Sequence, residues 1–163
     1  MSMGAYLTAG LGRMMLSLIF IVLGIASLFN WEDTEADFVS VLSNWELYAG
    51  NMDEAGNLFP LLIASVRIWA ILGIIFQLLG GILVFFGIQV RMGALLLLLH
   101  LIPVTILYHH FWFLDGQAMN RSLVLFLKNL SIIGGLFILL ALGRGQIRER
   151  APRGEKSCDK PKK

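Results

Sequence analysis

A small number of polar side chains interrupt long apolar segments of this sequence, and these are the residues whose types could do chemistry. They are Arg67 and Gln77 in one segment, His100 in the next, His109 and His110 just after it, and Lys128 with Asn129 in the last. A charged side chain at the centre of a bilayer costs about 3 kcal/mol or more, so each charged residue needs a structural or functional reason.

Two of the cations are predicted to lie at the same depth. Arg67 follows Pro60 by seven residues and Lys128 follows Leu123 by five. At 1.5 Å per residue, both lie within about 10 Å of one membrane boundary if their helices run in the same direction. The end of the third segment reaches that boundary too. The sequence therefore predicts a cationic and hydrogen-bonding cluster in the outer half of the domain: Arg67, His109, His110, Lys128 and Asn129.

This cluster has a functional interpretation and two structural ones. It could bind a small anion or a quinone-like headgroup. Alternatively, Arg67 and Lys128 could extend their long side chains to the interface, or pair with acids of the preceding loop, for which Glu46 is the preferred partner. Gln77 and His100 are predicted to be polar groups inside the bundle. The stripe containing Gln77 also includes Arg67, Ala70, Ile74 and Gly81, and it is predicted to face the other helices.

Other chemistries find little support. His100 and His109 are nine residues apart and thus on opposite faces of one helix, so a bis-histidine haem within the chain is not expected. No Cys/His spacing predicts a metal site, and no glycine loop predicts phosphate binding. Neither an intrinsic cofactor nor a nucleic-acid partner is expected. Because no catalytic constellation is recognisable, the chain is interpreted as non-catalytic on its own.

The elements that position these residues are predicted to be helices in a membrane. The chain has 163 residues, of which 57% are hydrophobic. Its apolar segments cover about 11–29, 60–88, 92–108 and 123–142. Each can cross about 30 Å of hydrocarbon as a helix, and backbone polar groups in lipid must be satisfied within the segment. The prediction is an all-α, four-transmembrane-helix bundle over residues 1–142. A cleaved signal peptide is the alternative for the first segment, although its apolar run is long for one.

Charge predicts the orientation of this bundle. The loop 30–59 has seven acids and no Lys or Arg, whereas eight bases follow residue 143. The positive-inside rule therefore places both termini in the cytoplasm and the loop outside. Within the loop, Phe38, Val41, Leu42 and Trp45 have helical spacing, which predicts a short amphipathic helix from about Glu35 to Ala49. The basic tail, 143–163, is predicted to be disordered.

Several sequence pieces resemble the DoxX family of small four-helix membrane proteins. The most specific are His110-Phe111-Trp112 and Phe126-Leu127-Lys128-Asn129-Leu130 followed by Gly134-Gly135. Gly12-Arg13 and Gln77-Leu78-Leu79-Gly80-Gly81 agree with the family as well. The family often has Glu where this chain has Gln77, and Lys where it has Ser27, so a proton-coupled role for those positions is in doubt.

The resemblance implies a multi-pass protein of the bacterial inner membrane. It also implies an accessory, non-catalytic subunit of a larger membrane complex, for which the family's examples are linked to redox systems. Its partners would be the lipid bilayer and other membrane subunits, contacted through loop 30–59 or the helix faces. The alternative is a quinone- or small-anion-binding subunit of an oxidoreductase.

Overall fold

The structure, a computed structural model, describes residues 3–49 and 58–143. The predicted disordered tail lies outside the described residues, apart from Gly143. The chain forms helices throughout these ranges: α1 (Met3–Phe29), α2 (Trp31–Ala49), α3 (Leu58–Ala64), α4 (Val66–Phe86), α5 (Val90–Tyr108), the 3₁₀ turn η2 (Phe111–Phe113) and α6 (Gly116–Leu142).

The predicted all-α fold with four spanning helices is confirmed. In the described part of the chain, four helical stretches are long and apolar enough to cross a membrane, with mean hydropathies of 2.1 to 2.4. They are Leu7–Phe29, Val66–Phe86, Val90–Phe113 and Gly116–Leu142. The predicted helix in the first loop is also present as α2.

Four helix boundaries differ clearly from the prediction. Helix α1 begins at Met3, eight residues before the apolar run that defined its prediction. The predicted helix 60–88 is interrupted at Ser65, which separates α3 from α4. The Ser65 hydroxyl donates to the carbonyls of Leu61 and Leu62. Helix α2 begins at Trp31 because helical hydrogen bonds, including Thr34 N–H to Asn30 O, continue around the corner from α1. Helix α6 begins at Gly116, seven residues before the apolar run that defined its prediction. Its first two turns are polar, as expected above a membrane.

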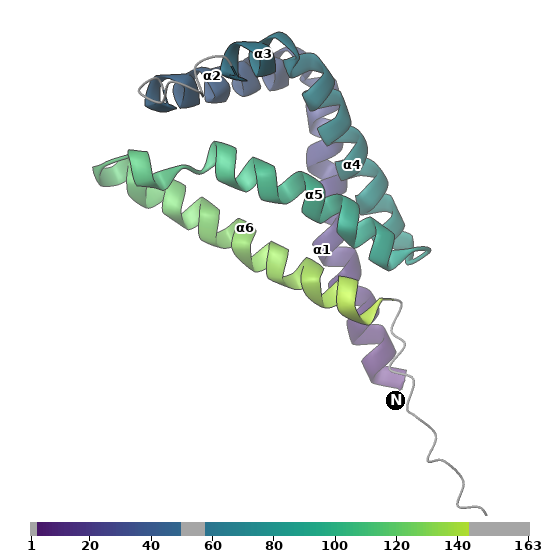
Figure 1. Ribbon diagram of the computed structural model, residues 1–163. Coiled ribbons are helices and arrows are strands. Elements are labelled where there is room, and N and C mark those ends of the chain that lie inside the picture. Colours follow the sequence, from purple (N-terminus) through teal and green to yellow (C-terminus); the bar gives the residue numbers. More distant parts are fainter. Residues whose placement is uncertain (1–2, 50–57, 144–163) are drawn as a thin grey trace, which may run out of the picture.

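The spanning helices form two pairs. Figure 1 shows α1 beside α4 and α5 beside α6, with α5 crossing α4 near the turn that joins them. Helices α2 and α3 lie across the other end of this arrangement. The core lies where α1, α4, α5 and α6 meet, and includes Phe20, Val84, Ala94, Leu97, Leu98, Leu101, Ile133 and Leu136.

A hydrogen bond and a set of rings attach α2 to the end of α5. The indole of Trp45 donates to the carbonyl of Leu107 at 2.9 Å. The Trp45 ring also meets those of His110 and Phe113 edge-on, with ring centroids 5.7 and 5.5 Å apart. Leu42, one turn earlier on α2, is 3% exposed. The amphipathic face predicted from the spacing therefore packs on the bundle.

Trp45→Phe is expected to lower the free energy of unfolding by about 1 kcal/mol, the typical net worth of one hydrogen bond. The cost stays small because Leu107 O keeps a second hydrogen bond, from His110. Thermal unfolding in detergent measures the change. Trp69→Phe is the control, since that indole donates only to Ser65 one turn earlier, at an exposed position. An equal loss in both variants would contradict an anchoring role for Trp45.

Candidate functional site

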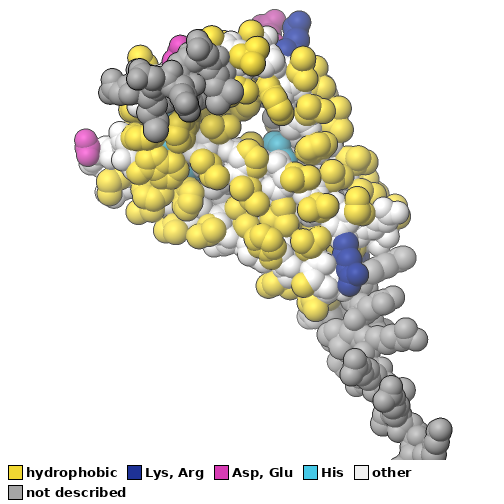
Figure 2. Space-filling model, viewed as in Figure 1, with side chains coloured by type: hydrophobic (Ala, Val, Ile, Leu, Met, Phe, Trp, Pro, Cys, Tyr) yellow, Lys and Arg dark blue, Asp and Glu magenta, His cyan; other side chains and the backbone are white. Residues whose placement is uncertain are grey.

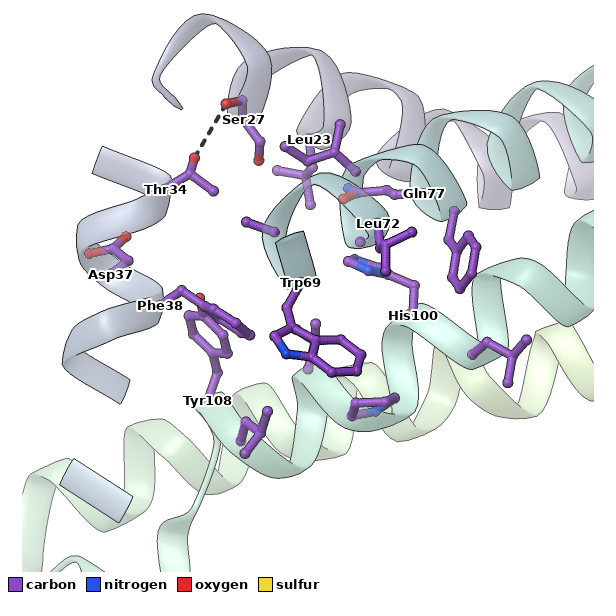
Figure 3. Close-up of a pocket in the computed structure, with 18 of the residues that line it drawn as sticks. Leu23, Ser27, Thr34, Asp37, Phe38, Trp69, Leu72, Gln77, His100 and Tyr108 are labelled. Atoms are coloured by element: carbon purple, nitrogen blue, oxygen red, sulfur yellow. Dashed lines mark hydrogen bonds between the residues drawn. The ribbon is translucent and has the colours of Figure 1, made fainter. Parts of the chain in front are cut away.

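A cavity of about 590 Å³ lies between α1, α2, α4 and α5, and Leu62 of α3 also lines it. Figure 3 shows side chains from these helices pointing into it from several sides. Most of its lining is apolar, including Leu23, Leu42, Phe76, Leu99 and Leu107. A volume of this size is within the range of sites that bind small molecules, which are also mostly apolar with a few polar groups.

The cavity opens between α4 and α5. Three lining side chains are well exposed: Trp69 (50%) and Leu72 (38%) on α4, and Leu99 (53%) on α5. Figure 2 shows a hollow edged by hydrophobic side chains with a histidine inside it. Figure 3, which labels His100, shows that side chain among those lining the cavity. Because α4 and α5 are spanning helices, this opening faces lipid.

His100 is the polar group best placed to hold a ligand. A Cβ at Gly73 would lie 3.2 Å from its Nδ1, so the glycine of α4 leaves the room that the imidazole occupies. Among the described residues, His100 makes no hydrogen bond or ion pair. A neutral imidazole offers one N–H donor and one acceptor nitrogen, and both are available here.

Gln77 lies one turn beyond Gly73 on α4 and is 6% exposed. Its amide N–H donates to the carbonyl of Phe20 at 3.2 Å, which ties α4 to α1. Figure 3 shows Gln77 in the same part of the cavity as His100. The interior thus combines a fixed amide with a free imidazole, surrounded by apolar side chains.

The end of the cavity next to α2 is more polar. It is lined by Ser27, Thr34, Asp37 and Tyr108. The hydroxyl of Thr34 donates to Asn30 O at 2.9 Å and to Ser27 O at 3.4 Å. Asp37 is the one charged side chain among the lining residues. A negative charge at this end disfavours an anionic ligand and tolerates a neutral one.

The residues of the predicted cationic cluster lie outside the lining of the cavity. Arg67 is 69% exposed and lies 3.7 Å from Glu35, so Glu35 replaces the expected partner Glu46. His110 is buried, and its Nδ1 lies 2.9 Å from Leu107 O. Because a carbonyl can only accept, His110 must donate this hydrogen bond.

The other members of the cluster lie elsewhere. His109 is half-buried beside His110. Lys128 is exposed on α6, and Asn129 is half-buried. None of the five lines the cavity. Their role in ligand binding stays a prediction.

Sequence reasoning missed Asp37, Trp69 and Gly73 as site residues. The available signal was the five-residue stripe on α4 that was predicted to face the other helices. Ala70, Ile74 and Gln77 of that stripe line the cavity, whereas Arg67 and Gly81 do not. That stripe marks the correct face of α4. The sequence alone did not show that α1, α2 and α5 leave a space in front of it.

Arg67→Ala is expected to lower the free energy of unfolding by less than about 1 kcal/mol, because the ion pair with Glu35 is largely exposed. It is also expected to leave any bound ligand in place, since Arg67 does not line the cavity. Thermal unfolding and mass spectrometry of extracted lipids measure the two effects. Loss of a ligand in this variant would instead support the predicted cluster as the site.

Comparison with known proteins agrees with this architecture. The sequence model of the DoxX family matches residues 9–110, a range that includes every residue lining the cavity. The chain is also similar to a protein of Escherichia coli (strain K12) named inner membrane protein YphA. The two are 25% identical over 137 residues, which cover 84% of each chain. No solved structure matches.

Proposed function

This chain belongs to the DoxX family, and we propose that it binds a lipophilic molecule with a small neutral headgroup, of the quinone class, between α4 and α5. We place it in the inner membrane, like its E. coli relative. We further propose that it acts there as a non-catalytic subunit of a larger membrane complex. The observation that carries the ligand proposal is an unpaired imidazole in an apolar cavity open to lipid.

Quinone chemistry suits this cavity in three respects. A quinone carbonyl accepts hydrogen bonds, and the imidazole of His100 has an N–H to donate. An isoprenoid tail is apolar and needs walls such as Leu72, Phe76 and Leu99. The ring is uncharged, which agrees with a lining whose one charge is Asp37. That same charge makes a small anion the weaker of the two ligand classes expected from the sequence.

Mass spectrometry of lipids extracted from the purified protein tests the ligand proposal. The protein is purified in a mild detergent, washed extensively, and compared with an unrelated four-helix membrane protein from the same membranes. We expect a quinone at about one molecule per chain, and none above background in the comparison protein. Phospholipids in bulk-membrane proportions, with no enriched quinone, would overturn the proposal.

The accessory role is supported by how little of α6 the rest of the chain covers. Of the four spans, that of α6 has the smallest share of buried residues, and within the described chain it packs mainly on α5 and η2. Native electrophoresis of membranes solubilised in mild detergent tests this role. We expect the chain to migrate in a complex larger than itself; a simple monomer or homo-oligomer would contradict the role.

A further inference from the structure

One side of α6 faces away from the rest of the chain. Its exposed residues Val124, Leu127, Lys128, Ser131 and Gly134 lie within about 120° of one another at 100° per residue. We call this set the free face of α6. It is opposite to Ile133, which is buried in the core. Figure 1 shows α6 at the edge of the molecule, with α5 along one side of it.

Lys128 makes this face unusual for a surface that contacts only lipid. It lies five residues after Leu123, about 8 Å below the outer end of the apolar run. No acidic residue pairs with it in the described parts of the chain. A base in the outer half of a span also does not help to set the topology, which basic residues on the cytoplasmic side determine. A charge in lipid is normally paired, so a partner from outside the chain is expected.

The sequence indicates that a second copy of this chain cannot supply an acidic partner for Lys128. All four candidate spans lack Asp and Glu. A second copy of this chain packed on the free face would therefore bring no intramembrane carboxylate to Lys128. In a symmetric contact it would bring a second lysine instead. The face fits a different protein.

Small residues next to Lys128 allow a helix to approach closely. A Cβ on Gly134 would meet nothing within 4 Å, so the backbone there is open. Ser131, one turn earlier, has its hydroxyl bonded to its own helix at Leu127 O and adds little bulk. Small residues spaced along one face are typical of contacts between transmembrane helices.

We infer that the free face of α6 binds a transmembrane helix of another protein, with an Asp or Glu of that helix paired to Lys128 in the outer half of the membrane. This inference rests on the proposed accessory role and names the surface that performs it. It is independent of the cavity, to which α6 contributes no residue.

Photo-crosslinking in the native membrane tests this surface. A photoreactive amino acid replaces Ser131 in the full chain, and the same probe at Ile106 of α5, which is 46% exposed, is the control. From Ser131 we expect a crosslinked peptide that belongs to a transmembrane segment of another protein and contains Asp or Glu. From Ile106 we expect lipid adducts alone.

Charge variants make the test specific. Lys128→Met is expected to lower the Ser131 crosslink at least fivefold, and Lys128→Arg to preserve it. Lys128→Glu should abolish it, and exchanging the partner's acid for lysine should restore it. Because the described chain gives Lys128 no partner, none of these changes should reduce the folded yield.

Three outcomes would overturn the inference: Ser131 crosslinks to a second copy of this chain, to lipid only, or to a segment without an acid. Native electrophoresis separates this failure from that of the accessory role. If the wild-type chain migrates in a larger complex but these crosslinks miss it, only the surface is wrong. If no larger complex exists, the accessory role itself fails.

Discussion

Gly93→Val is expected to separate α5 from α4 and to lower the free energy of unfolding by about 3 kcal/mol. A Cβ at Gly93 would lie 2.9 Å from the carbonyl oxygen of Gly80 and 2.8 Å from a methyl group of Val84. The contact is equally close from the side of α4, because a Cβ at Gly80 would lie 2.9 Å from the carbonyl oxygen of Gly93. Backbone atoms cannot rotate aside as a flexible side chain can, so the helices must move apart.

Detergent-solubilised protein provides the measurement, as the midpoint of thermal unfolding or the folded fraction in a denaturant titration. Gly12→Val on α1 is the matched control, since a Cβ there meets nothing within 4 Å. The control should change stability by only a few tenths of a kcal/mol, through helix propensity. Equal losses of stability in Gly93→Val and Gly12→Val would show that the destabilisation does not come from the close contact between α4 and α5.

His100→Phe is expected to weaken ligand binding about tenfold while leaving the fold intact. Phenylalanine retains a planar ring against Gly73, so packing changes little, but it removes the N–H that we assign to the headgroup. One hydrogen bond lost in an apolar site corresponds to about 1.4 kcal/mol, which is a tenfold change in Kd. Titration of the purified, ligand-stripped protein with a short-chain quinone measures the change.

His109→Phe is the matched control for this experiment. The two histidines lie on the same segment, but His109 does not line the cavity. We expect its replacement to change Kd less than twofold. A stronger effect from His109→Phe than from His100→Phe would move the site toward the cluster predicted from the sequence.

The four spans could be predicted because length and hydropathy alone determine whether a helix crosses a membrane. The helix in the first loop could be predicted for a similar reason, since Phe38, Leu42 and Trp45 share one face. Both are properties of single segments. The break at Ser65 was missed because a serine hydroxyl bonding to its own helix is compatible with either a continuous or an interrupted helix.

The arrangement of side chains around the site could be predicted only in part. Depth along a helix follows from residue number once the helix bounds are known. Arg67 is the second residue of α4, but Lys128 lies near the middle of α6, because α6 begins seven residues before its apolar run. Direction around the bundle depends on how the helices pack. Arg67 consequently meets Glu35 of α2, whereas Lys128 lies on the free face of α6. The cavity depends on five helices at once, and no single segment encodes it.

Photoaffinity labelling tests the central claim most directly, because it reports where a ligand lies. The purified protein is incubated with an azido-quinone, irradiated, digested and mapped by mass spectrometry, with excess unlabelled quinone as competitor. We expect competed labelling within Trp69–Gln77 of α4 and Leu99–Tyr108 of α5. Labelling confined to α6, or labelling that excess quinone does not reduce, would contradict the claim.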